Sequence, residues 1–239
     1  MKIYHAPGSE IPPGSDILRA MIDMEKKVFS RPQFDPAATG YDPTLAGWHS
    51  RPLREAALRH IHRPVRGAVL DVGCGPGVLL ATLAGENPDL RLAGIDLVPE
   101  MIRAAKDRLG PRADIRLGDA NQLPWEDGRF DVVTCIDSFQ HYLQPRAALA
   151  EIHRVLKSGG LLVIAGPWAP PVARQWLNLL RVVRSKSEAV IYGKREMLWM
   201  LRMEEFAQVA WFKEGSFGFV ATAMTPNVLP DMMRLETRF

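Results

Sequence analysis

The chain has 239 residues, of which 47% are hydrophobic and 24% charged, with a formal net charge of +3 and a pI of about 9.0. These values are typical of a globular protein and argue against a disordered, collagen-like or repeat protein. The basic residues are scattered, which disfavours nucleic acid as a partner, since nucleic-acid binders concentrate positive charge on one face. The densest basic stretch, residues 174–195, is interpreted as a solvated helix face, with contact to a polyanion as the alternative.

The ends of the chain and its cysteines indicate a cellular compartment. The first ten residues contain no basic segment followed by an apolar one, and no apolar run approaches the roughly 20 residues that span a bilayer. Cys74 and Cys135 lie in apolar contexts, without a CxxC or a metal-ligand spacing. Isolated thiols of this kind suit a reducing compartment. We therefore expect a cytoplasmic protein with no metal site and no membrane span.

Two parts of the chain differ in their hydrophobic pattern. Residues 1–65 are expected to form a helical cap or lid segment, with helical patterns over 17–28 and 51–62 and with Pro52 near the first turn of the second. From Gly67 onward, short apolar runs alternate with helical patterns, as in βαβ units with a parallel sheet. Residues 66–239 are therefore expected to form one domain, with a helical insertion at about 168–200.

The second part predicts seven strands and the helices that connect them. The predicted strands are 68–72, 90–96, 113–118, 130–136, 161–165, 210–214 and 219–224. The predicted helices are 77–84, 99–109, 144–156, 170–185 and 193–209. The third of these helices is expected to end at Ser158-Gly159-Gly160. The last two strands could pair as an antiparallel hairpin through residues 215–218.

A glycine-rich loop, Gly73-Cys74-Gly75-Pro76-Gly77, follows the first strand and opens a helix. Glycine lets the backbone turn sharply there and lets a ligand approach closely. The spacing is G-x-G-x-G, and Val78 stands where the dinucleotide fingerprint has its third glycine, which conflicts with an NAD-dependent dehydrogenase. Asp71 precedes the loop, and its carboxylate favours a cationic ligand, such as the α-ammonium of an amino acid, over a phosphate.

Two more carboxylates follow the next two strands. Asp96 ends the second strand, where a carboxylate can accept hydrogen bonds from both ribose hydroxyls. Asp119 follows the third strand, where it could accept one from an adenine amine. Taken alone, each Asp could equally cap a helix. Because open α/β sheets bind ligands beyond the carboxyl ends of their strands, three acids at these ends favour an adenosine-containing ligand.

Four segments carry a resemblance to a known family: VLDVGCGPGVLLATLA, GIDLVPEMIRAAKDRL, GDANQLPWEDGRFDVVTCIDSF and EIHRVLKSGGLLVIA. In this order they resemble the class I S-adenosylmethionine (SAM)-dependent methyltransferases of small molecules, in the methyltransferase type 11 and quinone-biosynthesis-like group. The resemblance covers about residues 67–165. It implies an α/β fold with a Rossmann-like, mostly parallel seven-stranded sheet, helices on both faces and the last strand antiparallel. It also implies SAM as the cofactor and S-adenosylhomocysteine as its product.

The same resemblance implies which residues contact SAM. The methionine part would lie on Asp71 and the loop residues Gly73, Cys74, Gly75 and Gly77, with Ile136 or Asp137 at its end. Asp96 would bind the ribose, and the adenine would lie among Leu97, Met101, Asp119 and Ala120. Upstream, Phe34-Asp35, Ala38 and Tyr41-Asp42 resemble an F-D-x-x-A-x-x-Y-D element of related methyltransferases. There Tyr41 would close over the SAM site; the alternative is a loop aromatic that packs on the core.

Methyl transfer is an in-line displacement at a carbon that the sulfonium has already activated, so it needs positioning and desolvation more than a base. His141, just after the fourth strand, is the first candidate for a catalytic base, and His49 is the second. A loop histidine satisfied by the backbone is the alternative for His141, as capping is for Asp137. The fourth strand is followed by Ile136-Asp137-Ser138-Phe139 and not by [N/D/S]-P-P-[Y/F], which disfavours amino methylation of nucleobases or glutamine.

The acceptor pocket is expected to form from the N-terminal segment and the insertion after the fifth strand. Aromatic and methionine side chains there either form ordinary core or line an apolar pocket: Pro167, Trp168, Trp176, Leu180, Tyr192, Met197, Trp199 and Met200. The sequence predicts a methyltransferase acting on a small, apolar or aromatic metabolite. The alternative is a non-catalytic SAM- or adenosine-binding protein with a regulatory or scaffold role. A homodimer is left open.

Overall fold

The computed structural model describes residues 45–61, 65–184 and 189–227. For residues 45–49 and 180–184 it describes only the backbone. The expected helix over 17–28 and Tyr41 lie outside the described residues. Leu180 and His49 belong to described helices, but their side chains fall outside the described part.

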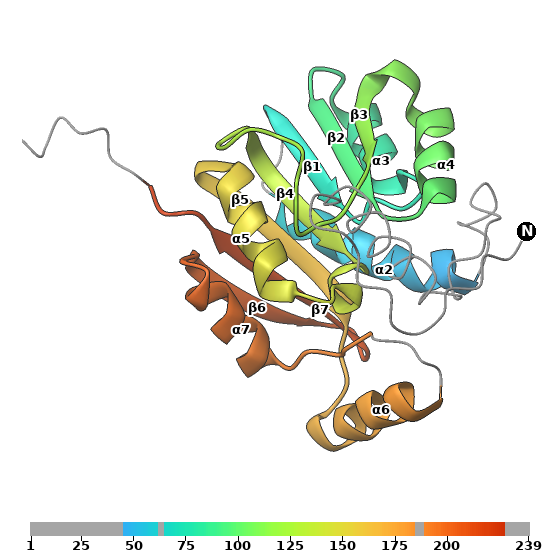
Figure 1. The fold of residues 1–239 in the computed structure, drawn as a ribbon, viewed down its shortest axis with the longest axis vertical. Helices are drawn as coiled ribbons and strands as arrows, with labels where there is room; N and C mark the ends of the chain where they lie inside the picture. The colour runs from blue at the N-terminus through green and yellow to red at the C-terminus, as the bar shows by residue number, and fades with distance from the viewer. Residues whose placement is uncertain (1–44, 62–64, 185–188, 228–239) are drawn as a thin grey trace, which may run out of the picture.

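Seven strands form one sheet in the order β3-β2-β1-β4-β5-β7-β6 (Figure 1). Their bounds are β1 Ala68–Val72, β2 Arg91–Asp96, β3 Ala113–Leu117, β4 Phe130–Ile136, β5 Leu156–Pro167, β6 Ala207–Glu214 and β7 Gly218–Met224. The pairs from β3 to β5 are parallel, while β7 is antiparallel to both β5 and β6. This confirms the predicted fold class, with the last strand antiparallel.

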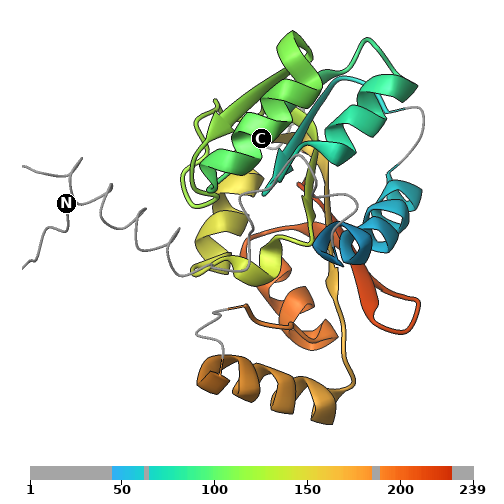
Figure 2. The same cartoon turned by 90° about the vertical axis from the view of Figure 1, so that its right-hand side faces the viewer.

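Helices cover both faces of the sheet: α2 Leu45–His60, α3 Val78–Glu86, α4 Pro99–Leu109, α5 Pro145–Val155, α6 Pro171–Arg184 and α7 Lys194–Met203. Apolar residues of α2, α3 and α4 pack in one core cluster. Those of α5 and α7 pack in another. Because both faces are covered, all five residues of the central strand β1 are buried. Helix α6 stands apart from the sheet at one end of the molecule (Figures 1 and 2).

The order of the strands places a candidate binding crevice. From β1 the chain steps to β2 and β3 on one side, and then crosses to β4 and β5 on the other. The connection that follows β1 leads to β2 on one side, and the connection that follows β4 leads to β5 on the other. Because the two connections diverge, a crevice opens beyond the carboxyl ends of β1 and β4. The predicted bounds of β1 and β4 are confirmed, and those of β2 and β3 differ from the structure by one residue each.

Helix α2 begins earlier than the sequence predicts. It starts at Leu45, so Pro52 lies inside the helix and not near its first turn. A proline inside a helix lacks the N–H that would bond the carbonyl four residues earlier. The helix continues because its other side is held by packing: Leu53, Ala56 and Ala57 are buried in the core.

Two predicted helix ends are wrong. Helix α5 ends at Val155 and passes directly into β5, so Ser158-Gly159-Gly160 lies inside the strand. The backbone N–H groups of Gly128 and Arg129 donate to the last carbonyls of α5, at Arg154 and Val155, so no glycine cap is needed there. Helix α7 ends at Met203 and not at Val209, because the chain takes a left-handed turn at Glu205 and then enters β6.

Candidate functional site

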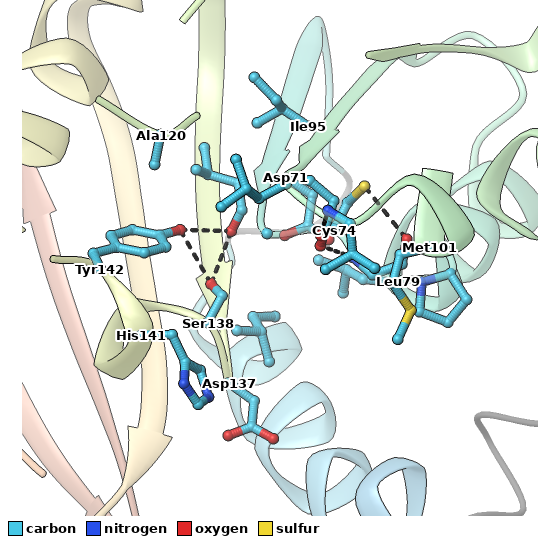
Figure 3. Close-up of a pocket in the computed structure, with 18 of the residues that line it drawn as sticks. Asp71, Cys74, Leu79, Ile95, Met101, Ala120, Asp137, Ser138, His141 and Tyr142 are labelled. Carbon is cyan, nitrogen blue, oxygen red and sulfur yellow. Dashed lines mark hydrogen bonds between the residues drawn. The ribbon is translucent and has the colours of Figure 1, made fainter. Parts of the chain in front are cut away.

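An open pocket lies beyond the carboxyl ends of β1, β2 and β4, with about 1030 Å³ of empty space when the solvent at its mouth is included. Of the residues singled out in the sequence, those that line it are Asp71, Gly73, Cys74, Gly75, Asp96, Leu97, Met101, Asp119, Ala120, Ile136, Asp137 and His141. We call residues 71–101 and 118–121 its glycine-loop side. The residues 136–143, together with Ser50 and Arg54 of α2, form its β4 side. Figure 3 shows Tyr142, His141 and Ser138 on the β4 side, opposite Leu79 and Met101.

The glycine loop is held in place by β2. The N–H groups of Gly73 and Cys74 both donate to the carbonyl of Ile95, at 2.8 and 3.0 Å. Gly73 has a φ of +74°, and a Cβ at this position would collide with the side chain of Ser138. At Gly75, with a φ of +52°, a Cβ would meet no atom within 4 Å. The loop is therefore tight against the β4 side at Gly73 and open at Gly75.

Gly77 has a different place from the one expected. It does not line the pocket. A Cβ at Gly77 would stand 2.9 Å from Leu109 Cδ1 and 3.2 Å from Ala105 Cβ, both on α4. The glycine thus lets the start of α3 approach α4 closely, which is a packing role.

Asp96 joins the loop to the next helix. Its Oδ2 accepts a hydrogen bond from the Gly75 N–H at 2.9 Å, and its Oδ1 accepts one from the Val98 N–H, also at 2.9 Å. Val98 is the residue that precedes α4, so the carboxylate also orients the backbone where this helix begins. The Oδ1 of Asp119 likewise accepts the N–H of Asn121, at 3.0 Å.

Asp71 is the deepest acid of the pocket. Its side chain is only 3% exposed, and the hydroxyl of Thr134 donates to its Oδ1 at 2.6 Å. The pKa of Asp71 is raised from 3.8 to about 7, chiefly by burial and to a smaller extent by the negative charge of Asp96. The hydrogen bond from Thr134 and the positive charge of Arg54 act in the opposite direction. A cation placed beside Asp71 would favour its charged form.

The β4 side depends on hydrogen bonds between distant parts of the chain. Tyr142 and Ser138 both donate to the carbonyl of Val72, at the end of β1, at 2.9 and 2.8 Å (Figure 3). Asp137 has a φ of +54°, and its carboxylate accepts from Ser50 Oγ at 2.5 Å and from Gln140 Nε2 at 2.7 Å. Helix α2 is therefore tied to the pocket through a side chain.

Sequence reasoning missed several pocket residues. Ser138 and Tyr142 flank His141 in the segment after β4, and their nearness to this candidate base was a signal. Ser50 and Arg54 line the pocket from α2; the sequence pointed to this segment through His49 but not to these two residues. The backbone of His49 adjoins Ser50.

Of the aromatic and methionine set, the members whose side chains are described do not line this pocket. Met197 and Met200 are buried in the core, and Trp168 and Tyr192 pack partly buried against it. Pro167 and Tyr192 border a separate space of about 190 Å³. Trp176 is 62% exposed and Trp199 53%. Met197 and Met200 therefore belong to the ordinary core, as the first of the two alternatives predicts, whereas Trp176 and Trp199 face solvent.

Among the described residues, no group of three or more His, Cys, Asp or Glu side chains could hold a metal ion. Within the same ranges, no helix combines the length and the apolar character needed to cross a bilayer. Cys74 and Cys135 are buried free thiols, and burial raises the pKa of each.

Comparison with known sequences adds to this geometry. A family model described as a methyltransferase domain matches residues 70–164. The demethylmenaquinone methyltransferase of Roseiflexus castenholzii is 31% identical over 175 residues, which cover 70% of this chain and 73% of that protein. The demethylmenaquinone methyltransferase of Deinococcus radiodurans is 37% identical over 130 residues, 53% of this chain and 52% of that protein. A malonyl-[acyl-carrier protein] O-methyltransferase of Laribacter hongkongensis is 33% identical over 145 residues, 56% of this chain and 49% of that protein. The chain spans about half the length of the last two relatives.

Solved structures agree on the fold. The YcgJ protein of Bacillus subtilis superposes with a TM-score of 0.61 at 19% identity, covering 75% of this chain and 100% of that one. A phosphoethanolamine N-methyltransferase of Haemonchus contortus, solved with S-adenosylhomocysteine, gives a TM-score of 0.67 at 16% identity, with 85% of this chain and 60% of that one covered. By sequence and by fold, this chain belongs to the class I SAM-dependent methyltransferases.

Proposed function

We propose that the pocket binds SAM and that the chain transfers its methyl group to a small, apolar or aromatic acceptor. One observation carries the proposal: Asp71, Asp96 and Asp119, which lie near the carboxyl ends of three successive strands, line one pocket together with the glycine loop. Carboxylates at these ends suit a ligand with a cationic end, a ribose and an adenine. The fit is supported by the open space at Gly75 and by the deep acid Asp71.

The residues of the glycine-loop side would each hold one part of SAM. Asp71 would face the ammonium of the methionine part, near Gly73, Cys74 and Gly75. Asp96 would accept from the ribose hydroxyls while it keeps the loop in place through Gly75. The adenine would lie along Leu97 and Met101, with Asp119 and Ala120 at its edge. When bound, SAM supplies a methyl group already activated by a sulfonium.

The β4 side would position the acceptor. His141 lines the pocket from a short 3-10 turn, held by the bond from its N–H to the carbonyl of Ser138 at 2.9 Å. We propose His141 as the base for an acceptor hydroxyl, with Asp137 at the methionine end of SAM. His49 stays a second candidate, and Tyr41 a candidate lid over the pocket. Because Ser50 and Arg54 already line the pocket, residues 1–65 are proposed as a cap on the domain of residues 66–239.

The activities for which two relatives are named guide the choice of acceptor. The two relatives are called demethylmenaquinone methyltransferase and malonyl-[acyl-carrier protein] O-methyltransferase. We propose a small molecule of this range, a quinol or a carboxylic acid, as acceptor, and we place the protein in the cytoplasm.

Calorimetric titration tests the proposal. SAM and S-adenosylhomocysteine should bind, and NAD should not, because the loop lacks the dinucleotide spacing. Failure of both sulfur ligands to bind at millimolar concentration would contradict the proposal.

A second experiment tests the catalytic step with methyl-labelled SAM and a panel of quinols, catechols and carboxylic acids. His141→Ala should lower kcat by about 10²–10⁴-fold, with SAM affinity unchanged. An unchanged kcat would remove the base from the mechanism. Tight SAM binding without transfer to any acceptor would favour the non-catalytic alternative.

A further inference from the structure

Gln140 is a buried polar residue next to the proposed base His141. It lies in the 3-10 turn Phe139–His141, just after β4, and it is only 5% exposed. Asp137 and His141, before and after it in the chain, line the large pocket, whereas Gln140 borders the separate space of about 190 Å³. A buried amide needs hydrogen-bond partners, and these partners show what the side chain holds.

The side chain of Gln140 holds the carboxylate of Asp137. Its Nε2 donates to Asp137 Oδ1 at 2.7 Å, and Ser50 Oγ donates to Asp137 Oδ2 at 2.5 Å. Each oxygen of this carboxylate therefore has a donor from a different element, the 3-10 turn and α2. The backbone of Asp137 has a φ of +54°, which residues other than glycine seldom adopt. Such a conformation persists where the surroundings hold it, and Gln140 supplies part of that hold.

The surroundings of Gln140 fix the direction of its amide. Its Oε1 lies against β5, since a Cβ at Gly166 would stand 3.4 Å from it. With the amide reversed, its oxygen would face the carboxylate of Asp137 without a proton between them. The backbone carbonyl of Gln140 accepts the N–H of Val190 at 2.8 Å. The turn is thereby anchored to the segment that leads into α7.

These contacts indicate that Gln140 acts through Asp137. We propose that Gln140 is a positioning residue for methyl transfer: by holding Asp137, it fixes the methionine end of SAM so that the sulfonium methyl faces the acceptor. This inference rests on the proposed function of the pocket. A displacement of about 1 Å at the reacting atoms can cost about 100-fold in rate. The contacts of the glycine-loop side with ribose and adenine would still supply most of the affinity, so turnover should fall more than SAM binding.

The variant Gln140→Met tests this, because it keeps the length of the side chain and removes the donor. With labelled SAM and an acceptor found in the panel of quinols, catechols and carboxylic acids, kcat per SAM-binding site should fall about 10–100-fold. The Kd for SAM should stay within about threefold of the wild-type value. The stoichiometry of calorimetric titration counts the folded sites, so partial unfolding does not enter kcat.

Asn178→Leu is the matched control, because it also replaces an amide by an apolar side chain. Asn178 Nδ2 donates to the carbonyl of Ile191 at 3.2 Å, and its Oδ1 accepts the N–H of Ile191 at 3.0 Å. The control therefore loosens the same segment, next to Val190, and leaves the bond between Gln140 and Asp137 in place. Its kcat per site should equal that of wild type.

Nuclear magnetic resonance gives a readout that needs no acceptor. The methyl group of bound [methyl-¹³C]SAM should give one signal in wild type, and the same signal in Asn178→Leu. In Gln140→Met that signal should be shifted or broadened, because Asp137 is no longer held in one orientation. A general loss of stability would not move the signal of the molecules that remain folded.

Gln140→Glu keeps the shape of the side chain and allows a rescue, also where Gln140→Met does not fold. At about pH 9 its carboxylate would repel that of Asp137, whereas at about pH 6 the two share a proton and the bond returns. Its methyl signal should match that of wild type at the lower pH and differ at the higher.

Two results would overturn the proposal. The first is a wild-type methyl signal in Gln140→Met, or in Gln140→Glu at both pH values. The second is the same change of signal or kcat in Asn178→Leu, which would assign the effect to loosening of the segment. Failure of wild type to bind SAM would instead contradict the proposed function.

Discussion

The glycine-loop side of the pocket is assembled from nearby stretches of chain, whereas the β4 side depends on distant ones. Asp96 reaches Gly75 across 21 positions, and Asp119 bonds a residue two positions away. On the β4 side, Ser138 and Tyr142 reach Val72 across 66 and 70 positions, and Ser50 reaches Asp137 across 87. Apart from Asp71, which accepts from Thr134 across 63 positions, the first side carries its geometry within a few consecutive elements, while the second exists only when the whole sheet is formed. Ligand affinity should follow the first side, and turnover the second.

The largest effect on stability is expected at Gly73, where the glycine-loop side contacts Ser138 of the β4 side. Gly73→Ala combines a left-handed φ with a collision against Ser138, and we expect a loss of about 2–6 kcal/mol in the free energy of unfolding. Gly75→Ala is the matched control, since its Cβ meets nothing within 4 Å; it should cost about 1 kcal/mol. Urea unfolding measures both. Equal losses of unfolding free energy in the two variants would mean that the close contact between Gly73 and Ser138 contributes nothing to stability.

The next prediction concerns the pH dependence set by Asp71. Its pKa in the folded protein is about 7, above the ordinary 3.8, so folding favours the protonated form. The stability from this group is therefore present at low pH and is lost as pH rises from about 4 through 7. Relative to Asp71→Asn, wild type should lose about 2–3 kcal/mol of unfolding free energy between pH 5 and pH 8.

Urea unfolding of wild type and Asp71→Asn at both pH values checks this. The same variant should bind SAM more weakly at pH 8, where wild type presents a carboxylate. Parallel pH profiles for the two proteins would contradict the raised pKa.

A smaller effect separates ligand affinity from loop stability. Asp96→Ala should weaken SAM binding by about 1.5–3 kcal/mol, the cost of losing charged hydrogen bonds. Asp131→Ala is the control, because Asp131 also accepts a backbone N–H, from Ala68 at 2.7 Å, but at the opposite end of β1. Both variants should lose stability, and only the first should lose affinity in calorimetric titration. Unchanged affinity in Asp96→Ala would contradict the ribose assignment.

The smallest predicted effect tests whether a change on the β4 side leaves SAM affinity at the glycine-loop side unchanged. Tyr142→Phe removes one of two hydroxyls that donate to the carbonyl of Val72, and should lower the unfolding free energy by about 0.5–1.5 kcal/mol. SAM affinity should stay at the wild-type value. If titration instead showed a loss as large as that of Asp96→Ala, the two sides would act as one unit.

The same contrast explains what could be predicted from the sequence. The bounds of β1, α4 and β4 follow from local patterns, and the loop, Asp71, Asp96 and Asp119 follow from the ends of their strands. The family resemblance implies that Gly77 contacts SAM, but a Cβ at Gly77 would meet α4, a later element of the chain, so its role there is packing. Ser50 and Arg54 could not be found, because only packing of α2 against β5 and β7 brings them to the pocket. The ends of α5 and α7 were missed for the same reason: neighbouring segments and turns define them, not helix propensity.

The two bonds to the carbonyl of Val72 also impose an order on folding. Ser138 and Tyr142, which hold the glycine loop from the β4 side, are synthesised 66 and 70 positions after Val72. During synthesis the chain emerges from its N-terminus, so the loop must wait for Tyr142 before it is held on both sides. Long-range contacts of this kind slow folding, because the intervening chain must close first. A nascent chain that ends before β4 would contain the whole glycine motif and still lack a finished pocket.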